Sequence, residues 1–396
     1  MKGITRTIWI LSLVSLFTDI ASEMLYPVMP VYLKSIGFSV VLIGILEGFA
    51  EAIAGLGKGY FGKMSDNLGR RVPFVRLGYL LSAISKPMMA VFTFPAWIFS
   101  ARTIDRIGKG IRTGARDALL SDEATPLTKG KVFGFHRSMD TTGAVLGPLS
   151  ALLFLYFYPA HYKTLFYIAF LPGIVAISLT LLVKDKNPAP KASIAKTYFL
   201  DFIRYWKRSP TIYRKLVVGL LLFALFNSSD VFLLLKIKEV GFSDTQTIGV
   251  YIFYNLIYAL SAFPLGIIAD RLGLKNVFIF GLILFAVVYI GMSLNTGLYM
   301  FFVLFFVYGL YAAATEGVAK AWISNVTDPR DTATAIGTFA GFQSICTMFA
   351  STIAGFLWFK YGAAVAFTST SVVTVFVILY FLRLKNLTRN NHSLVP

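Results

Sequence analysis

The sequence predicts an all-helical membrane protein in which twelve transmembrane helices form two pseudo-symmetric six-helix bundles. Its composition, its regularly spaced apolar segments and an internal repeat support this fold class. Of the 396 residues, 57% are hydrophobic and only 14% are Asp, Glu, Lys or Arg, whereas an ordinary globular domain contains about 25% of these charged residues. So few charges cannot cover a water-exposed surface, which excludes a soluble enzyme.

Twelve segments are long and apolar enough to cross a membrane, because a bilayer core of about 30 Å requires about 20 mainly apolar residues per helix. The fourth segment is recognised by its position, since it is heavily charged. We expect residues 1–183 to form an N-terminal bundle, 184–215 a cytoplasmic linker and 216–396 a C-terminal bundle. The predicted spans are residues 7–33, 41–62, 73–93, 96–119, 132–158, 162–183, 216–236, 246–268, 276–294, 298–324, 333–358 and 362–382.

Basic residues predict the orientation of the chain. An even number of spans places both termini on one side; if that side is inside, 22 Lys and Arg fall in inner segments and 5 in outer loops. Inner loops of membrane proteins are enriched in Lys and Arg, so we expect both termini to be cytoplasmic, in the inner (plasma) membrane. The first span carries Asp19 and Glu23 and exceeds a signal-peptide core in length, so we expect it to be retained.

The basic stretch Lys184–Lys215 is the predicted linker between the two bundles. Within it, Tyr198–Lys207 has the pattern of a short amphipathic helix on the inner membrane surface. A solvated basic connector without regular structure is the alternative. The side chains expected to face lipid are Phe199, Phe202, Ile203 and Trp206.

Two short motifs recur at one offset, which indicates an internal duplication. Gly37-Phe38-Ser39 recurs as Gly241-Phe242-Ser243, 204 residues later. At the same offset, the pattern Gly-x3-Asp-x2-Gly-x-basic that starts at Gly62 recurs from Gly266. Short glycine motifs that match by chance would rarely share an offset. We therefore expect two halves related by an axis along the membrane normal, with a site between them near the membrane midplane.

The segment Gly62–Arg71, between spans two and three, resembles the inner-loop signature of the major facilitator superfamily, and Gly266–Lys275 is its counterpart. The resemblance covers nearly the whole chain and implies a transporter whose halves rock around a central site. It also implies that Asp66 with Arg70 or Arg71 stabilises one gating state; a loop that only sets the membrane topology is the alternative. The expected gating residues are Gly62, Asp66, Gly69, Arg70, Arg71, Gly266, Asp270, Arg271 and Gly273.

Spans one and two carry acidic side chains on polar faces. In span one, Asp19, Glu23 and Tyr26 form one stripe at helical periodicity, and Pro27 and Pro30 can bend the outer part of the helix. A carboxylate at the centre of a membrane helix costs about 2.5–3.5 kcal/mol on insertion scales. These groups must therefore face a cavity or each other. The charged residues that share one face of span two are Glu47, Glu51 and Lys58.

Span four is the most highly charged segment of the chain. Its charged residues share one face, and three central charges turned to lipid would cost about 8–10 kcal/mol, so we expect them to face the bundle interior. Arg102 also stands where many facilitators carry an arginine. An ion-paired lattice with the acids of span one, holding helices together, is the alternative, and Arg112, Arg116 and Asp117 near the inner surface are expected to be structural. The expected coupling residues here are Arg102, Asp105, Arg106 and Lys109.

Span five carries Arg137 and Asp140 in its inner half, followed by Gly143, Gly147 and Pro148. The glycine–proline pattern resembles the helix-five signature of facilitator antiporters, which implies export of the substrate. Small residues also let helices approach closely and proline bends a helix. A packing motif without directional meaning is therefore the alternative.

The second half has fewer ionisable groups in its spans. Glu316 and Lys320 are four residues apart and can pair with each other on one helix, or they can face the site. The asymmetry predicts that coupling resides in the first half, while polar and aromatic groups of the second half shape the substrate pocket. The residues expected to line that pocket are Tyr26, Asn227, Asp230, Asn255, Glu316 and Lys320.

Several motifs are absent from the sequence. It contains no Gly-x4-Gly-Lys-[Ser/Thr] loop of the kind that binds ATP phosphates. Its three histidines are not spaced as metal ligands, and the single Cys346 excludes disulfides within the chain. We therefore expect no catalytic site, metal or cofactor, no nucleic-acid partner, and a monomer in the bilayer.

These features together predict a secondary transporter that exports a small organic molecule in exchange for protons. Asp19, Glu23 and Glu51 are the expected proton acceptors, because burial favours the neutral form of a carboxyl group and a nearby arginine favours the charged form. The first alternative is a proton symporter that imports an organic anion. The second is a membrane sensor or scaffold that uses the same fold without transport.

Overall fold

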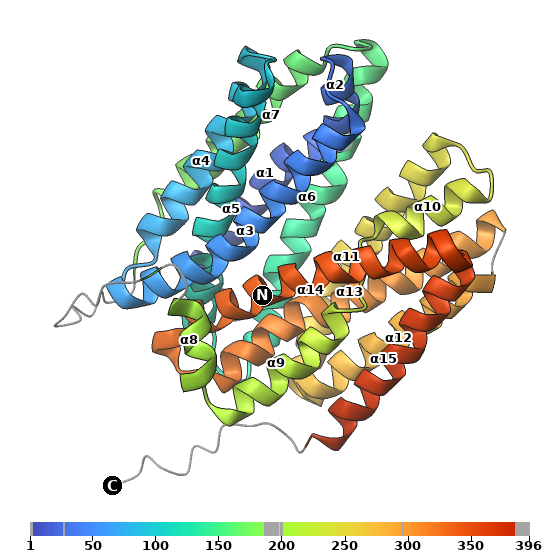
Figure 1. The fold of residues 1–396 in the computed structure, drawn as a ribbon. Coiled ribbons are helices and arrows are strands. Elements are labelled where there is room, and N and C mark those ends of the chain that lie inside the picture. Colours follow the sequence, from blue (N-terminus) through green and yellow to red (C-terminus); the bar gives the residue numbers. More distant parts are fainter. Residues whose placement is uncertain (1–2, 27, 186–197, 199–200, 295–296, 385–396) are drawn as a thin grey trace, which may run out of the picture.

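The computed structural model describes residues 3–26, 28–185, 198, 201–294 and 297–384, and every regular element in them is a helix. The first six predicted spans form one bundle (Figure 1). Its helices are α1 (Arg6–Leu25), α2 (Met29–Ser35), α3 (Val40–Leu68), α4 (Val72–Val91), α5 (Pro95–Asp122), α6 (Lys129–Phe157) and α7 (Tyr162–Thr180).

The second bundle contains the last six spans and follows the short helix α8 (Asp201–Arg208). By length and composition, eight helices of the described residues qualify as membrane spans. The other four spans are α3, α4, the charged α5 and a pair of short helices, α9 and α10. The helices of this bundle are α9 (Thr211–Ala224), α10 (Val231–Glu239), α11 (Asp244–Leu272), α12 (Leu274–Leu294), α13 (Leu298–Val326), the 3-10 turn η1 (Pro329–Asp331), α14 (Thr332–Tyr361) and α15 (Ala363–Arg383).

The first and seventh spans are each broken into two helices. α1 ends at Leu25 and α2 begins at Met29, so the predicted bend is a complete break; Pro27 itself lies outside the described residues. α9 ends at Ala224 and α10 begins at Val231, at the corresponding place in the repeat. No proline lies in this second break. The polar run Asn-Ser-Ser-Asp at 227–230 occupies it instead, and such side chains compete for backbone hydrogen bonds.

The Gly-Phe-Ser repeat has the same structure in both bundles. Gly37 and Gly241 have φ angles of 92° and 97°, in the left-handed region that favours glycine. Ser39 then caps α3 and Ser243 caps α11, each accepting a hydrogen bond from a backbone N–H three residues later. The repeated motif is therefore a turn followed by a helix start, which confirms the duplication.

The predicted amphipathic helix is present as α8, but its tryptophan does not face lipid. The ring of Trp206 lies 6.4 Å from Tyr213 and 6.0 Å from Phe342, between ring centroids. The expectation for Trp206 was wrong, because helical periodicity cannot tell a membrane surface from a neighbouring helix. Ile203 is exposed, as expected. The residue Phe199 and the side chain of Phe202 lie outside the described part of the chain.

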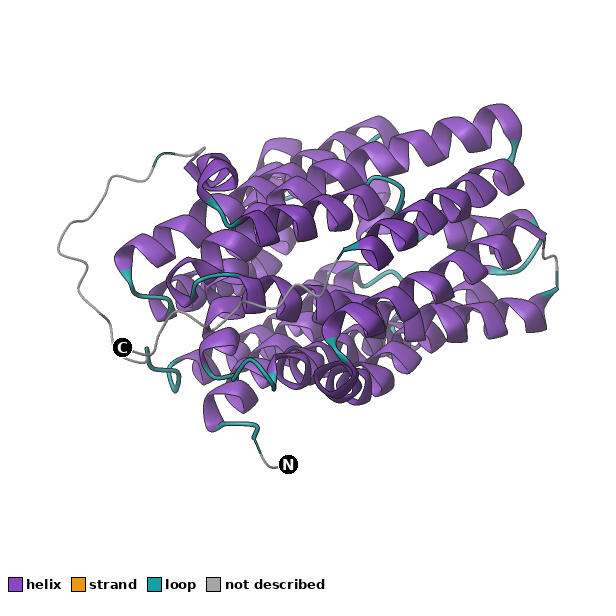
Figure 2. Cartoon of the chain, turned by 90° about the horizontal axis from the view of Figure 1, so that it is seen from below, coloured by secondary structure: helices purple, strands orange, loops and turns teal. Residues whose placement is uncertain are grey.

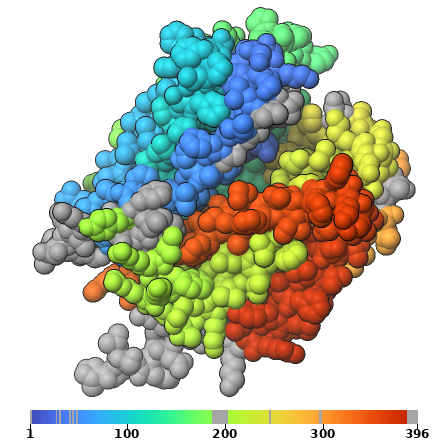
Figure 3. All heavy atoms as spheres, viewed as in Figure 1, coloured from blue at the N-terminus to red at the C-terminus, as the bar shows by residue number. Residues whose placement is uncertain are grey.

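The helices run side by side with loops at both ends (Figure 2). Gly3 lies against Lys131, and the ammonium group of Lys275 donates to the carbonyl of Leu384, so both ends of the described chain meet the same set of loops. We call this the terminal end. There α3 packs against α14, as Figure 3 shows, and α6 packs against α11. Towards the opposite end, which carries α2 and α10, the bundles diverge (Figure 1).

Candidate functional site

Two carboxylates at corresponding positions of the repeat fasten the bundles together at the terminal end. Asp66 of α3 accepts hydrogen bonds of 2.7 Å from the backbone N–H and the hydroxyl of Thr334, at the start of α14. Asp270 of α11 accepts bonds of 2.7 Å from the backbone N–H groups of Gly130 and Lys131, at the start of α6. N–H groups in a first helical turn lack intrahelical partners, and the helix dipole favours a negative charge there. Each carboxylate therefore binds the other bundle and holds the terminal end closed. We call these two contacts, of Asp66 and of Asp270, the latches.

Glycines of the same loops allow the helices to cross closely. A Cβ atom on Gly62 would lie 2.5 Å from the carbonyl oxygen of Ala333, and one on Gly266 would lie 2.3 Å from that of Gly130. Both contacts join the two bundles, so a larger residue would push the bundles apart. The final glycines of the motif, Gly69 and Gly273, have φ angles of 63° and 96°.

Two basic residues of the first loop add to these contacts: Lys63 lies 3.9 Å from Asp331 of the second bundle, and Arg71 binds Asp66 itself. Its guanidinium group forms ion pairs with Asp66, at 3.4 Å, and with Asp122, and it donates to the carbonyl of Pro329. Arg70 and Arg271 are exposed, and neither forms an ion pair with a described residue.

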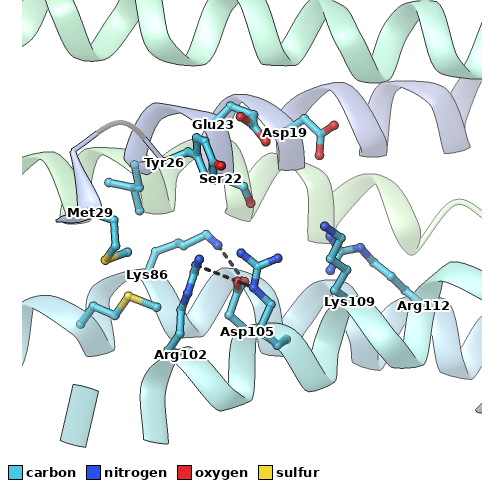
Figure 4. A pocket seen from close by; sticks show the side chains of 13 residues that line it. Asp19, Ser22, Glu23, Tyr26, Met29, Lys86, Arg102, Asp105, Lys109 and Arg112 are labelled. Carbon is cyan, nitrogen blue, oxygen red and sulfur yellow. Dashed lines mark hydrogen bonds and ion pairs between the residues drawn. The ribbon is translucent and has the colours of Figure 1, made fainter. Parts of the chain in front are cut away.

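Beyond the closed terminal end, a cavity of about 380 Å³ lies between the bundles, and a pocket of about 60 Å³ extends from it into the first bundle. We call them the central cavity and the side pocket; Figure 4 shows the side pocket. The charged side chains of the spans could otherwise have faced lipid. The expected site residues that line one or both are Asp19, Glu23, Tyr26, Arg102, Asp105, Arg106, Lys109, Arg137, Asp140, Asp230, Asn255, Glu316 and Lys320.

The charges of α5 form an ion-paired lattice, but not with the acids that we expected. Asp105 lies 2.8 Å from the ammonium group of Lys86, and the guanidinium groups of Arg102 and Arg106 are 3.5 and 3.7 Å away. Arg106 also forms a 2.7 Å ion pair with Glu51 of α3. Lys86, on α4, escaped the sequence analysis because it is an isolated charge in a mainly apolar span, ten residues from the other basic residue, Arg76. The side chain of Glu47 lies outside the described part of the chain.

A second set of ion pairs joins the bundles across the central cavity. Lys320 of α13 lies 2.8 Å from Asp117 of α5, and Glu316 of α13 pairs with Arg137 of α6. The suggested pairing of Glu316 with Lys320 was therefore wrong, because each finds an oppositely charged partner on the facing bundle. Arg116 also pairs with Asp117, at 2.8 Å. Arg116 and Asp117 are buried residues of the cavity lining, and the structural role expected for them stays a prediction.

Asp19 and Asp140 form a pair of neighbouring carboxyl groups on the wall of the central cavity. Both residues line the central cavity, and α1 and α6 cross closely beside them, at Gly143, three residues after Asp140. Asp140 also accepts a 2.6 Å bond from the hydroxyl of Ser15 and a 2.7 Å bond from Arg137. Within the described residues, neither Asp19 nor Glu23 forms an ion pair. The two acids of α1 therefore face the cavity without a basic partner.

The glycines of the expected helix-five motif set the distance between α6 and α1. A Cβ on Gly143 would lie 2.6 Å from the carbonyl oxygen of Leu16 and 2.8 Å from the Cβ of Asp19. One on Gly147 would lie 2.7 Å from the backbone nitrogen of Met24. Pro148 follows inside the helix. The motif thus holds Asp19 next to Asp140.

Tyrosines form the wall of the cavity that the second bundle contributes. Tyr251, Tyr254 and Tyr258 line the cavity. Behind them, the buried Tyr308 lies 5.1 Å from Tyr254 and 5.1 Å from Tyr311, between ring centroids. Asp230 accepts a 2.7 Å bond from the Tyr308 hydroxyl, and Asn227 donates to the Tyr311 hydroxyl from outside the cavity lining. The sequence analysis anticipated aromatic groups in this half but did not identify these tyrosines, because they are dispersed among many others.

The family model described as Major Facilitator Superfamily matches residues 11–253 and 232–394. A protein of Methanocaldococcus jannaschii described as an uncharacterized MFS-type transporter is 32% identical over 93% of this chain and 94% of its own length. A Lactococcus lactis protein described as a multi-drug resistance efflux pump PmrA homolog is 22% identical over 93% of this chain and 92% of its own.

A solved structure with the same fold is that of the major facilitator superfamily transporter FucP in the outward conformation. The two chains superpose with a TM-score of 0.80 at 10% sequence identity. The match covers 96% of this chain and 99% of the other. The agreement extends over both bundles, so it confirms the twelve-helix fold class.

Proposed function

We propose that this chain, which belongs to the major facilitator superfamily and is a membrane transporter, exports a small organic molecule in exchange for protons. The observation that carries the proposal is the carboxyl pair of Asp19 and Asp140 on the wall of the central cavity. Asp19 has no basic partner among the described residues, and it faces the space that a substrate would occupy.

Two carboxyl groups that neighbour each other on a cavity wall can share one proton, since ionising both would place two negative charges side by side. Asp140 has a serine and an arginine to stabilise its negative charge, so the proton resides on Asp19. Asp19 is therefore the group that takes up and releases the transported proton.

Alternating access follows from two kinds of contact between the bundles: the carboxylate latches at the terminal end and the ion pairs across the central cavity. With the terminal end in the cytoplasm, as the basic loops favour, the latches of Asp66 and Asp270 close the cytoplasmic side while the cavity faces outward. Rocking to the inward-facing state breaks both latches and separates Arg137 from Glu316. Once Arg137 is separated from Glu316, it interacts more strongly with Asp140. The changed charge beside Asp19 then changes the affinity of Asp19 for a proton.

Two observations support export rather than import. The relative that is described as a multi-drug resistance efflux pump aligns over nearly the whole chain. The glycine motif that resembles the helix-five signature of exporters packs directly against α1 at Asp19. In an exporter that uses the proton gradient, Asp19 takes up a proton from outside and releases it inside. These two steps return the empty carrier for the next cycle.

The experiment uses inverted membrane vesicles with an acidified interior and a compound to which expression of the chain confers resistance in a growth screen. Coupled to one proton, a gradient of one pH unit supports about a tenfold concentration ratio, because each unit corresponds to 1.36 kcal/mol. We expect the wild-type chain to accumulate the compound to about this ratio. Asp19→Asn should accumulate none above equilibrium while still exchanging labelled for unlabelled compound. Glu239→Gln, which changes an exposed acid of α10 outside the cavity lining, should retain gradient-driven accumulation.

Each alternative has its own outcome. Uptake into right-side-out vesicles under an inward proton gradient would indicate a symporter instead. A chain that confers no resistance and moves no compound in either orientation would indicate a sensor or scaffold. Gradient-driven accumulation by Asp19→Asn at the wild-type level would remove the proposed proton site.

A further inference from the structure

The basic residues of the two cavities fall into two groups. Most of them form an ion pair with an acidic side chain, as described for the lattice of α5 and the pairs that cross the central cavity. Lys58 of α3 and Lys109 of α5 form none with any described residue, although both line the central cavity. Arg112, one turn beyond Lys109, bonds the Ser82 hydroxyl and lies 4.6 Å from the Tyr79 ring, without an acid.

The acids near these cations neutralise them only in part: Glu51 and Glu23 interact electrostatically with Lys109 without forming an ion pair with it, and Glu51 already pairs with Arg106. Figure 4 places Asp19 and Glu23 on one side of the pocket and Lys109 and Arg112 on the other, with no ion pair between the two sides. Together the two cavities are lined by nine basic and seven acidic residues of the described chain. If Asp19 carries the shared proton, the excess of positive charge grows further. An empty cavity of this kind is electrostatically strained, because like charges disfavour each other at short range.

The wall opposite these cations offers aromatic surface rather than free carboxylates. Tyr251, Tyr254 and Tyr258 of α11 line the central cavity. Of the acids on this side, Asp230 accepts from a tyrosine hydroxyl and Glu316 pairs with Arg137. A ligand here would therefore meet aromatic faces on one side and uncompensated cations on the other. The volume of about 380 Å³ lies within the range of small-molecule sites.

We propose that the transported substrate is a small organic anion, whose acidic group binds between Lys58, Lys109 and Arg112 and whose apolar body packs on the tyrosines of α11. This inference rests on the proposed function, since it names the substrate class of the same cavity. An acidic group replaces the missing counter-charge of the lysines, and charge-assisted hydrogen bonds are among the strongest polar contacts. The tyrosine wall selects for an aromatic or aliphatic body over an inorganic ion.

The test measures equilibrium binding to the purified full chain with three probes of one shape: 2-naphthoate, the uncharged 2-naphthamide and the cationic 2-naphthylmethylammonium. Calorimetry and the shift of the unfolding temperature report the affinity at neutral pH. We expect 2-naphthoate to bind more tightly than both other probes. Lys109→Gln and Lys58→Gln should each weaken its binding about tenfold or more, as expected for a lost charged hydrogen bond. The binding of 2-naphthamide should not change in these variants.

Two controls separate charge from folding. Lys109→Arg keeps the positive charge and should retain most of the affinity for 2-naphthoate. Lys34→Gln removes an exposed lysine of α2 and should change nothing. Tighter binding of the ammonium probe, unchanged binding of 2-naphthoate in both Gln variants, or no binding of any probe at millimolar concentration would overturn the inference.

The binding test is independent of proton coupling, because it applies no gradient. If 2-naphthoate binds as expected while Asp19→Asn still accumulates substrate against a gradient, the proposed proton site fails and the anion site stands. If the probes fail and the gradient-driven transport depends on Asp19, the reverse holds.

Discussion

The two bundles share one architecture but fill their interiors with different chemistry. In the first bundle, a buried carboxylate, Asp105, is surrounded by Lys86, Arg102 and Arg106. In the second bundle, the partly buried acid Asp230 has a tyrosine hydroxyl as its partner. The duplication has therefore preserved the turns, caps and latches, while the interiors have diverged.

This difference separates two tasks that a carrier must perform. A lattice of full charges responds strongly to a proton or to an anionic substrate, because electrostatic interactions are strong where water is scarce. A wall of tyrosines offers contact area and single hydrogen bonds, which tolerate substrates of varied shape. The first bundle is thus suited to coupling and the second to shaping the pocket.

The largest expected effect is on stability, at the centre of the charge lattice. Lys86→Met removes the closest partner of Asp105 and leaves a buried charge less compensated, which should cost about 3–5 kcal/mol. Lys86 is 2% exposed, so water cannot replace the lost partner. Thermal unfolding of the purified chain measures the loss.

Tyr311→Phe is the matched variant in the second bundle. It removes the acceptor for the Asn227 amide and should cost about 1 kcal/mol, the net value of an ordinary hydrogen bond. Equal losses for the two variants would contradict the contrast between the bundles.

The latches should differ in strength although they occupy equivalent positions. Asp66 is 3% exposed and also pairs with Arg71, whereas Asp270 is only partly buried. Asp66→Asn should shift the equilibrium towards opening of the terminal end by about 1.5–3 kcal/mol, the range for hydrogen bonds to charged groups. Asp270→Asn should shift it in the same direction by a smaller amount.

Spin labels report this opening directly. In a Cys346→Ser background, labels at the exposed positions of Arg70 and Arg271 mark the first and second bundles at the terminal end. We expect a longer-distance population that is larger for Asp66→Asn than for Asp270→Asn. An unchanged distance distribution in both variants would show that the carboxylates do not hold the bundles together.

Two glycines test the same contrast between the bundles through packing rather than charge. Gly143→Ala would press a methyl group against Leu16 and Asp19, and overpacking of this kind costs about 1–3 kcal/mol. Gly249 in α11 has no atom within 4 Å of an added Cβ, so Gly249→Ala should be neutral or stabilise by about 0.4–1 kcal/mol. Thermal unfolding checks both, and gradient-driven transport should fall only in Gly143→Ala. A loss of transport in Gly249→Ala alone would reverse the assignment of coupling to the first bundle.

The sequence predicted most of the fold because its strongest signals are local. The lengths of the apolar segments located the spans, and the break after Leu25 follows from the prolines near it. Helical periodicity also indicated that Asp19 and the charges of α5 share polar faces. It could not identify their partners, since Asp117 and Lys320 are more than 200 residues apart. Lys86 and the tyrosine wall had no local pattern at all.

By itself, the sequence determined that this protein lies in a membrane, that it is duplicated and which of its helices carry charge. Apolar length, repeated turns and helical periodicity are properties of neighbouring residues, and they hold in any packing of the helices. Only the tertiary structure decided which charges neutralise each other and which are left for a ligand. That outcome depends on distances between helices, which the packing of distant segments sets.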